Sequence, residues 1–270
     1  MSINCGRSFT TKNPLYGDSL FSCYTNRNLT SMTLLFILLM GLCVGSFLNV
    51  VIIRLHERQS LGGRSRCPHC SHTLAWYDLF PVLSFVVQHG RCRYCKQRIS
   101  WQYPLIELAT GLLFLLLSLA NLPPIYCLAS TIYISLLIVT LITDLRWNLI
   151  YDAVLWPGII LALLIPLVSS PSLATTYSSI LLAALVGGGV FALQHIVSRG
   201  RWVGSGDIIL GVFLGLILGF PLILWALFLA YVSGAIVALL LMSLGLKTKK
   251  DTLPLGCFLC AAGILLLLIH

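Results

Sequence analysis

The stretch TLLFILLMGLCVGSFLNVVII, from Thr33 to Ile53, decides the solvent in which this chain folds. Its 21 consecutive residues contain no charged side chain, and a helix of about that length crosses the roughly 30 Å hydrocarbon core of a bilayer. In the whole chain 58% of the residues are hydrophobic and only 9% are charged, which is outside the range of soluble globular proteins. The sequence therefore predicts a membrane protein.

Further apolar segments follow the first one, and the expected fold is an all-α polytopic membrane protein with about eight transmembrane helices. After Thr33–Ile53, the predicted spans are Pro104–Ala120, Ile125–Thr143, Ala153–Val168, Tyr177–Val197, Ile208–Phe220, Leu222–Leu244 and Leu253–Ile269. The span from Ile208 is short for a bilayer. Residues 1–32 are polar and predict a disordered tail, unless translation begins at Met32 instead of Met1.

The basic residues predict how the chain is oriented in the membrane. Fourteen of the 17 Lys and Arg residues fall in loops that share one side of the predicted bundle. They are Arg54, Arg58, Arg64, Arg66, Arg91, Arg93, Lys96, Arg98, Arg146, Arg199, Arg201, Lys247, Lys249 and Lys250. Short loops rich in Lys and Arg stay in the cytoplasm, so this side is expected to be cytoplasmic. Nucleic-acid binding is not expected, because the positive charge is divided among short loops.

One soluble segment, residues 54–103, predicts a small zinc-binding cytoplasmic domain between the first two helices, followed by a transmembrane core over residues 104–270. Its motifs CPHC and CRYC supply Cys67, Cys70, Cys92 and Cys95. Two such pairs can hold one structural zinc ion tetrahedrally. Two disulfides or four separate thiols are the alternatives, and a reducing cytoplasm disfavours disulfides. His69 and His72 are near enough in sequence to replace a ligand.

The chain has only eight acidic residues, so each one can be placed. Four are expected on solvated surface: Asp18, Glu57, Asp78 and Asp251. The other four lie at the ends of predicted spans: Glu107, Asp144, Asp152 and Asp207. An ionisable residue at membrane depth costs about 2.5 to 3.5 kcal/mol, which makes it a functional candidate.

The stretch VGSGDIIL, residues 203–210, places Asp207 directly after two glycines and before an apolar run. Gly204 and Gly206 permit a close approach to a neighbouring helix. Two carboxylates brought together share a proton, so that one can activate water while the other acts as an acid. This is the chemistry of aspartic proteases. The alternative is that Asp207 only caps the N-terminus of its helix.

Six motifs, in order, resemble the type IV prepilin peptidases, which are bifunctional leader peptidases and N-methyltransferases of the GxGD aspartic class. They are GSFLNVVIIRL, SRCPHCSHTLAWYDLFPVLSF, GRCRYCKQRISWQYPLIELATG, TDLRWNLIYD, GSGD and LPLGCFL. The resemblance implies that Asp144 and Asp207 are catalytic, that Asp152, Gly204, Gly206 and Glu107 support them, and that the four cysteines bind zinc.

The same resemblance implies the reaction and its setting. The substrates would be prepilins or pseudopilins, cut after a glycine at the cytoplasmic face of a bacterial inner membrane. The new N-terminal amine would then be methylated from S-adenosylmethionine.

This chain departs from the family pattern at three places. Tyr151 stands where the family usually has proline, Ile209 stands where it often has lysine, and the last motif carries Leu255 and Cys257. The Tyr151–Asp152 pair also resembles presenilin-type peptidases, which would pair Asp152 with Asp207.

Two other classes of protein fit the sequence less well. A secondary transporter would have acids near the middle of the membrane and an internal repeat, and neither is visible. A membrane-tethered zinc module would leave Asp144 and Asp207 without a role.

Overall fold

The computed structural model describes residues 30–120, 122–169, 172–246 and 253–269. These parts form helices joined by turns and loops, with two isolated β-bridges. Most of the predicted N-terminal tail, including Met1 and Asp18, lies outside the described residues, as does the predicted loop with Lys247, Lys249, Lys250 and Asp251.

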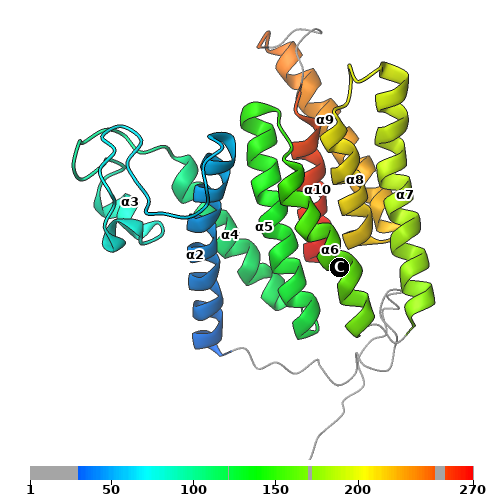
Figure 1. The fold of residues 1–270 in the computed structure, drawn as a ribbon, viewed down its shortest axis with the longest axis horizontal. Coiled ribbons are helices and arrows are strands. Elements are labelled where there is room, and N and C mark those ends of the chain that lie inside the picture. Colours follow the sequence, from blue (N-terminus) through cyan, green and yellow to red (C-terminus); the bar gives the residue numbers. More distant parts are fainter. Residues whose placement is uncertain (1–29, 121, 170–171, 247–252, 270) are drawn as a thin grey trace, which may run out of the picture.

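Within the described ranges, the apolar segments predicted from the sequence are helices (Figure 1). Five are long and apolar enough to cross a membrane: α2 (Ser31–His56), α4 (Gln102–Leu119), α5 (Pro124–Trp147), α7 (Leu173–Ser198) and α9 (Leu222–Ser243). Three more apolar helices complete the bundle: α6 (Asp152–Ser169), α8 (Ser205–Leu218) and α10 (Leu255–Ile269). The predicted all-α, multi-pass fold is therefore confirmed, and the predicted short span, α8, has 14 residues.

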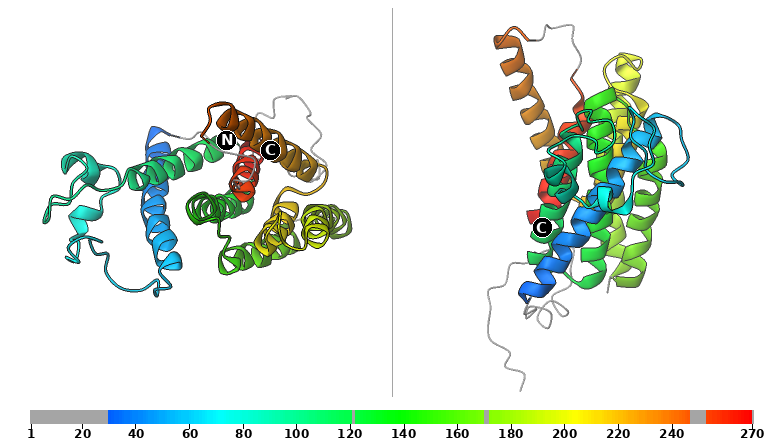
Figure 2. Two further views of the ribbon diagram at one scale, coloured as in Figure 1. Left: turned by 90° about the horizontal axis from the view of Figure 1, so that it is seen from above. Right: turned by 90° about the vertical axis from the view of Figure 1, so that its left-hand side faces the viewer.

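Small residues set how closely the helices pack. A Cβ atom added at Gly45 of α2 would lie 2.7 Å from the Cα of Glu107 in α4. In the same way, a Cβ atom at Gly211 of α8 would lie 2.6 Å from the carbonyl oxygen of Gly187 in α7. Such contacts let helix backbones approach within lipid. They create two close pairs, α2 with α4 and α7 with α8, on either side of α5, α6 and α10 (Figure 2).

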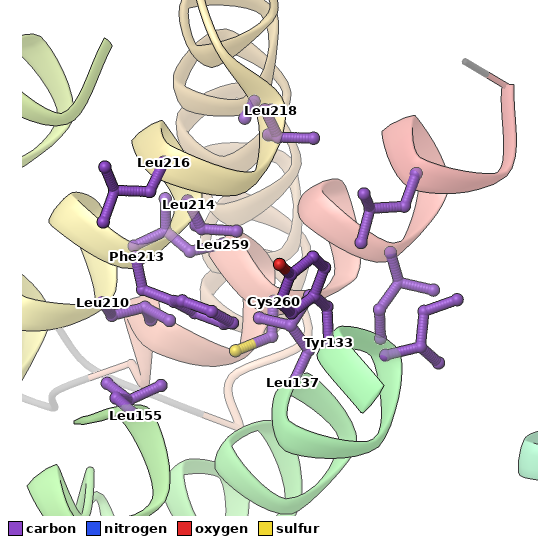
Figure 3. Packing of buried hydrophobic residues seen from close by; sticks show 14 of the residues in the cluster. Tyr133, Leu137, Leu155, Leu210, Phe213, Leu214, Leu216, Leu218, Leu259 and Cys260 are labelled. Atoms are coloured by element: carbon purple, nitrogen blue, oxygen red, sulfur yellow. The ribbon is translucent and has the colours of Figure 1, made fainter. Parts of the chain in front are cut away.

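The apolar core joins α5, α8 and α10 (Figure 3). Phe213 of α8 is fully buried and meets Tyr133 of α5 edge to face, with ring centroids 5.9 Å apart. Leu259 and Cys260 of α10 pack in the same cluster and are also fully buried. In this packing, the last turn of α5 lies at the same end of the bundle as the first turns of α8 and α10 (Figure 1).

Between α2 and α4 lies a segment of short elements, residues 57–101, called here the four-cysteine domain. It contains the short helices η1 (Trp76–Leu79) and α3 (Leu83–Val87) and projects from one side of the bundle (Figure 1). Its elements are short, so the domain depends on interactions other than a large apolar core.

Asp78 provides one of these interactions, and its predicted solvated position is wrong. Its side chain is only 2% exposed and pairs with Arg93 Nε at 3.1 Å. Gln88 and Tyr94 donate further hydrogen bonds to the same carboxylate. A buried carboxylate needs such partners. In a domain with little apolar core, this ion pair and its hydrogen bonds connect η1 to the segments around Gln88 and Tyr94.

Candidate functional site

Asp144 lies in the last turn of α5 and is only 5% exposed. Its Oδ2 atom accepts a hydrogen bond of 2.7 Å from the backbone N–H of Cys257, in the first turn of α10. N–H groups in the first turn of a helix have no partner within their own helix, and they favour an anion. A Cβ atom at Gly256 would lie 2.8 Å from Asp144 Oδ2, so a glycine leaves room for the carboxylate. The start of α10 therefore holds Asp144 in place.

Asp207 is held in a similar way by its own helix. It is the third residue of α8, and its Oδ2 atom accepts a hydrogen bond of 3.0 Å from the backbone N–H of Gly204. The helix-cap interpretation is thus correct for one oxygen. Within the described ranges the other oxygen, Oδ1, makes no hydrogen bond, and the side chain is only partly buried. The helix-cap hydrogen bond therefore involves only the Oδ2 atom of Asp207.

Ile150, in the loop between α5 and α6, connects the two acidic positions. A Cβ atom at Gly206 would lie 2.7 Å from the Cβ of Ile150, and one at Gly256 would lie 3.0 Å from its Cδ1. Ile150 therefore contacts the residue before Asp207 and the residue whose backbone borders Asp144. Both acids therefore lie at the same end of the bundle, with Ile150 packed against a glycine that neighbours each of them.

The two remaining residues that were predicted to support the acids are Asp152 and Glu107. Asp152 is the exposed first residue of α6. Glu107 is buried in α4 and accepts a hydrogen bond of 2.7 Å from the backbone N–H of Val82, just before α3. This bond ties a transmembrane helix to the four-cysteine domain.

Sequence reasoning missed the contacts of Ile150 and the backbone groups of Gly256 and Cys257. For Gly256 and Cys257 a signal was available. Both lie in LPLGCFL, one of the six motifs that carry the family resemblance.

The predicted cysteine cluster forms. The sulfur atoms of the four cysteines lie within 4.8 Å of one another, and all four are free thiols. Each pair sits in the same kind of turn: the Cys67 N–H donates to the His72 carbonyl at 3.0 Å, and the Cys92 N–H donates to the Gln97 carbonyl at 2.8 Å. Four cysteine sulfurs in this arrangement fit a closed, structural zinc site. His72 instead packs against Tyr94, with ring centroids 3.7 Å apart and the ring planes tilted by 34°.

The first cysteine turn favours ionisation of Cys67. Burial opposes loss of its proton, but hydrogen bonds from the backbone of Cys70 and His69, together with those from the Cys70 and Cys92 side chains, lower the pKa of the Cys67 thiol to about 7. The thiolate is the form that binds zinc.

Comparison with known proteins identifies the family. The model of the bacterial peptidase A24 N-terminal domain matches residues 39–121, and the model of the type IV leader peptidase family matches residues 131–239. The prepilin leader peptidase/N-methyltransferase of Bacillus subtilis is 32% identical over 87% of this chain and 92% of its own length. The chain belongs to the type IV leader peptidase family.

Two further members of the type IV leader peptidase family extend the comparison. The prepilin leader peptidase/N-methyltransferase of Myxococcus xanthus is 37% identical over 77% of this chain, but the match spans only 62% of that protein. The type 4 prepilin-like proteins leader peptide-processing enzyme of Escherichia coli O78:H11 is 35% identical over 83% of this chain and 89% of its own length. The search of solved structures found no match.

Proposed function

We propose that this chain cleaves the leader peptides of prepilins or pseudopilins, with Asp144 and Asp207 as its catalytic pair. The observation that supports this most directly is the placement of both acids around Ile150, where the ends of α5, α8 and α10 meet. Membership in the type IV leader peptidase family supplies the class of reaction. Co-expression with a prepilin tests it: the mature pilin should accumulate only when the enzyme is present.

The two carboxyl groups divide the work of hydrolysis. One carboxylate removes a proton from a water molecule as the water oxygen attacks the carbonyl carbon of the scissile peptide bond. The other, protonated, gives its proton to the leaving amine nitrogen as the carbon–nitrogen bond breaks. Backbone N–H groups of Cys257 and Gly204 each hold one oxygen of an acid, which limits rotation and leaves the other oxygen of each acid for water or peptide.

Cleavage takes place at the cytoplasmic face in this proposal, at the end of the bundle that carries the four-cysteine domain and Asp207. The described basic residues gather at that end, including Arg146 in the last turn of α5 and Arg201 in the loop before α8 (Figure 1). Loops rich in Lys and Arg stay inside the cell.

Reporter fusions test this orientation. A fluorescent protein joined after Arg201 should fluoresce, because it would remain in the cytoplasm, whereas a phosphatase joined after Pro123, at the opposite end, should be active. The reverse pattern would contradict the proposed cytoplasmic face and the role of the basic loops.

A second activity, methylation of the new N-terminal amine, is proposed from the names of the Bacillus subtilis and Myxococcus xanthus relatives. S-adenosylmethionine would supply the methyl group. One cavity, of about 100 Å³, is mostly apolar and lies among residues such as Tyr126 and Ile165, at the end of the bundle away from Asp144. It does not fit a charged nucleoside, since pockets for such ligands measure about 300 Å³ or more. This cavity therefore does not indicate which residues of the chain would carry out the methyl transfer.

Mass spectrometry of the processed pilin tests the second activity. We expect one added methyl group on the N-terminal residue when the enzyme and S-adenosylmethionine are both present. A cleaved pilin with an unmodified amine, in the presence of the cofactor, would contradict the transfer and leave the peptidase proposal intact.

A further inference from the structure

Three aromatic side chains connect the end of α2 to the loop beside the acids. His56, in the last turn of α2, stacks on Trp147 with ring centroids 3.9 Å apart and only 10° between the ring planes. The Tyr151 hydroxyl oxygen lies 3.4 Å from Nδ1 of His56. His56, Trp147 and Tyr151 are called here the His56 clamp. Arg146 adds a cation–π contact to the Trp147 ring, 5.2 Å from its centroid.

The His56 clamp holds both ends of a short loop. Trp147 is the last residue of α5 and Tyr151 immediately precedes α6, so the residues between them form a connection with little freedom of its own. Asn148, directly after Trp147, has left-handed backbone angles, with φ 50° and ψ 41°. This turn reverses the chain and brings Ile150 back toward the acids.

Ile150 connects this loop to the two helix ends that hold the acids. It contacts Gly206, next to Asp207, and Gly256, which borders Asp144 Oδ2. Neither glycine has a side chain that could move to take up a displacement, so a shift of Ile150 is transmitted to the two helix ends. The contacts run from His56 through the loop to both acids without a gap.

The starting point of this path also belongs to the four-cysteine domain. Two residues before His56, Arg54 donates hydrogen bonds to the carbonyl groups of residues 60–64, including one of 2.6 Å to Leu61. The last turn of α2 therefore fixes the start of that domain with one side chain and the loop at the acids with another.

We propose that His56 is a positioning residue for peptide cleavage, which acts through Trp147, Tyr151 and Ile150 to set the separation of Asp144 and Asp207. The inference rests on the proposed role of the two acids. It also gives Tyr151 a function: its hydroxyl group contacts His56, which a proline at this position could not do.

Steady-state cleavage of a prepilin by the full-length enzyme tests this role. His56→Ala should lower kcat about tenfold, because a displacement of about 1 Å at a catalytic group has effects of up to a hundredfold, and should leave KM nearly unchanged. His56→Phe keeps a ring on Trp147 and should recover most of kcat. Tyr151→Phe should have a smaller effect than His56→Ala, and adding it to His56→Ala should cause no further loss, because both changes break the same contact.

Hydrogen exchange provides a readout that does not depend on activity. In His56→Ala, amides of residues 147–151 should exchange faster while α4 and α7 exchange as in the wild type. Glu57→Ala, a change of the exposed neighbouring residue outside the His56 clamp, should leave both kcat and exchange unaltered.

Three results would overturn the proposal: a wild-type kcat in His56→Ala, a His56→Phe variant as slow as His56→Ala, or a rise in KM alone. If the acids were misassigned, Asp144→Asn and Asp207→Asn would still cleave, whereas the exchange of residues 147–151 would still report on the His56 clamp. The two failures are therefore distinguishable.

Discussion

Asp144→Asn and Asp207→Asn should each abolish leader-peptide cleavage while the protein still inserts and folds. The asparagine side-chain oxygen can accept the same hydrogen bond from Cys257 or from Gly204, so each helix end keeps its partner. What is lost is a group that can take or give a proton, and losses of this kind reduce rates by about 10²- to 10⁴-fold. The double variant should be little slower than either single variant, because the two acids act in one step. Prepilin processing on a gel, with the amount of enzyme in the membrane measured in parallel, checks both parts.

Asp152→Asn is the matched control for this prediction. Asp152 is exposed at the start of α6, close in sequence to Ile150, so its loss should weaken cleavage without eliminating it. An active Asp144→Asn variant together with an inactive Asp152→Asn variant would show that the presenilin-like pairing of Asp152 with Asp207 operates instead. If Asp207 were only a helix cap, its replacement by alanine would cost about 1 kcal/mol of stability and leave activity measurable.

Loss of zinc should have the second largest effect, and it should be confined to the four-cysteine domain. We expect about one zinc ion per chain, as four sulfur ligands require. Cys92→Ser should release the ion and unfold residues 57–101, because structural zinc contributes about 10 kcal/mol or more to the folding of such small domains. Metal analysis and limited proteolysis of the purified enzyme measure the two consequences. The membrane helices should resist the protease in both proteins.

Cys43→Ser is the control for the zinc experiment, since Cys43 is exposed on α2 and lies outside the cysteine cluster. It should keep both zinc and protease resistance. Wild-type enzyme without zinc, or a Cys92→Ser variant with its zinc retained, would contradict the metal assignment.

Local patterns were sufficient to predict the fold class and the cysteine cluster. An uncharged run such as Thr33–Ile53 has no stable position outside lipid or a protein core, so the apolar helices follow from composition and length. The paired C-x2-C turns place both cysteines of each pair on one short loop, which is why the spacing alone predicted that Cys67 and Cys70 would act together. The distribution of Lys and Arg among the loops likewise predicted that Asp144 and Asp207 lie at the same end of the bundle.

Only the tertiary structure decided which groups surround the acids. Asp144 and Cys257 are 113 residues apart, and no local periodicity indicates that the end of α5 meets the start of α10. Other features also depend on segments that meet only in the folded protein. They are the burial of Asp78, the contacts of Ile150 with Gly206 and Gly256, and the stacking of His56 on Trp147. Sequence determines the apolar segments, the cysteine turns and the helix ends, because these depend on neighbours along the chain. Contacts between ends depend on how α5, α8 and α10 pack around Phe213, which is a property of all the helices together.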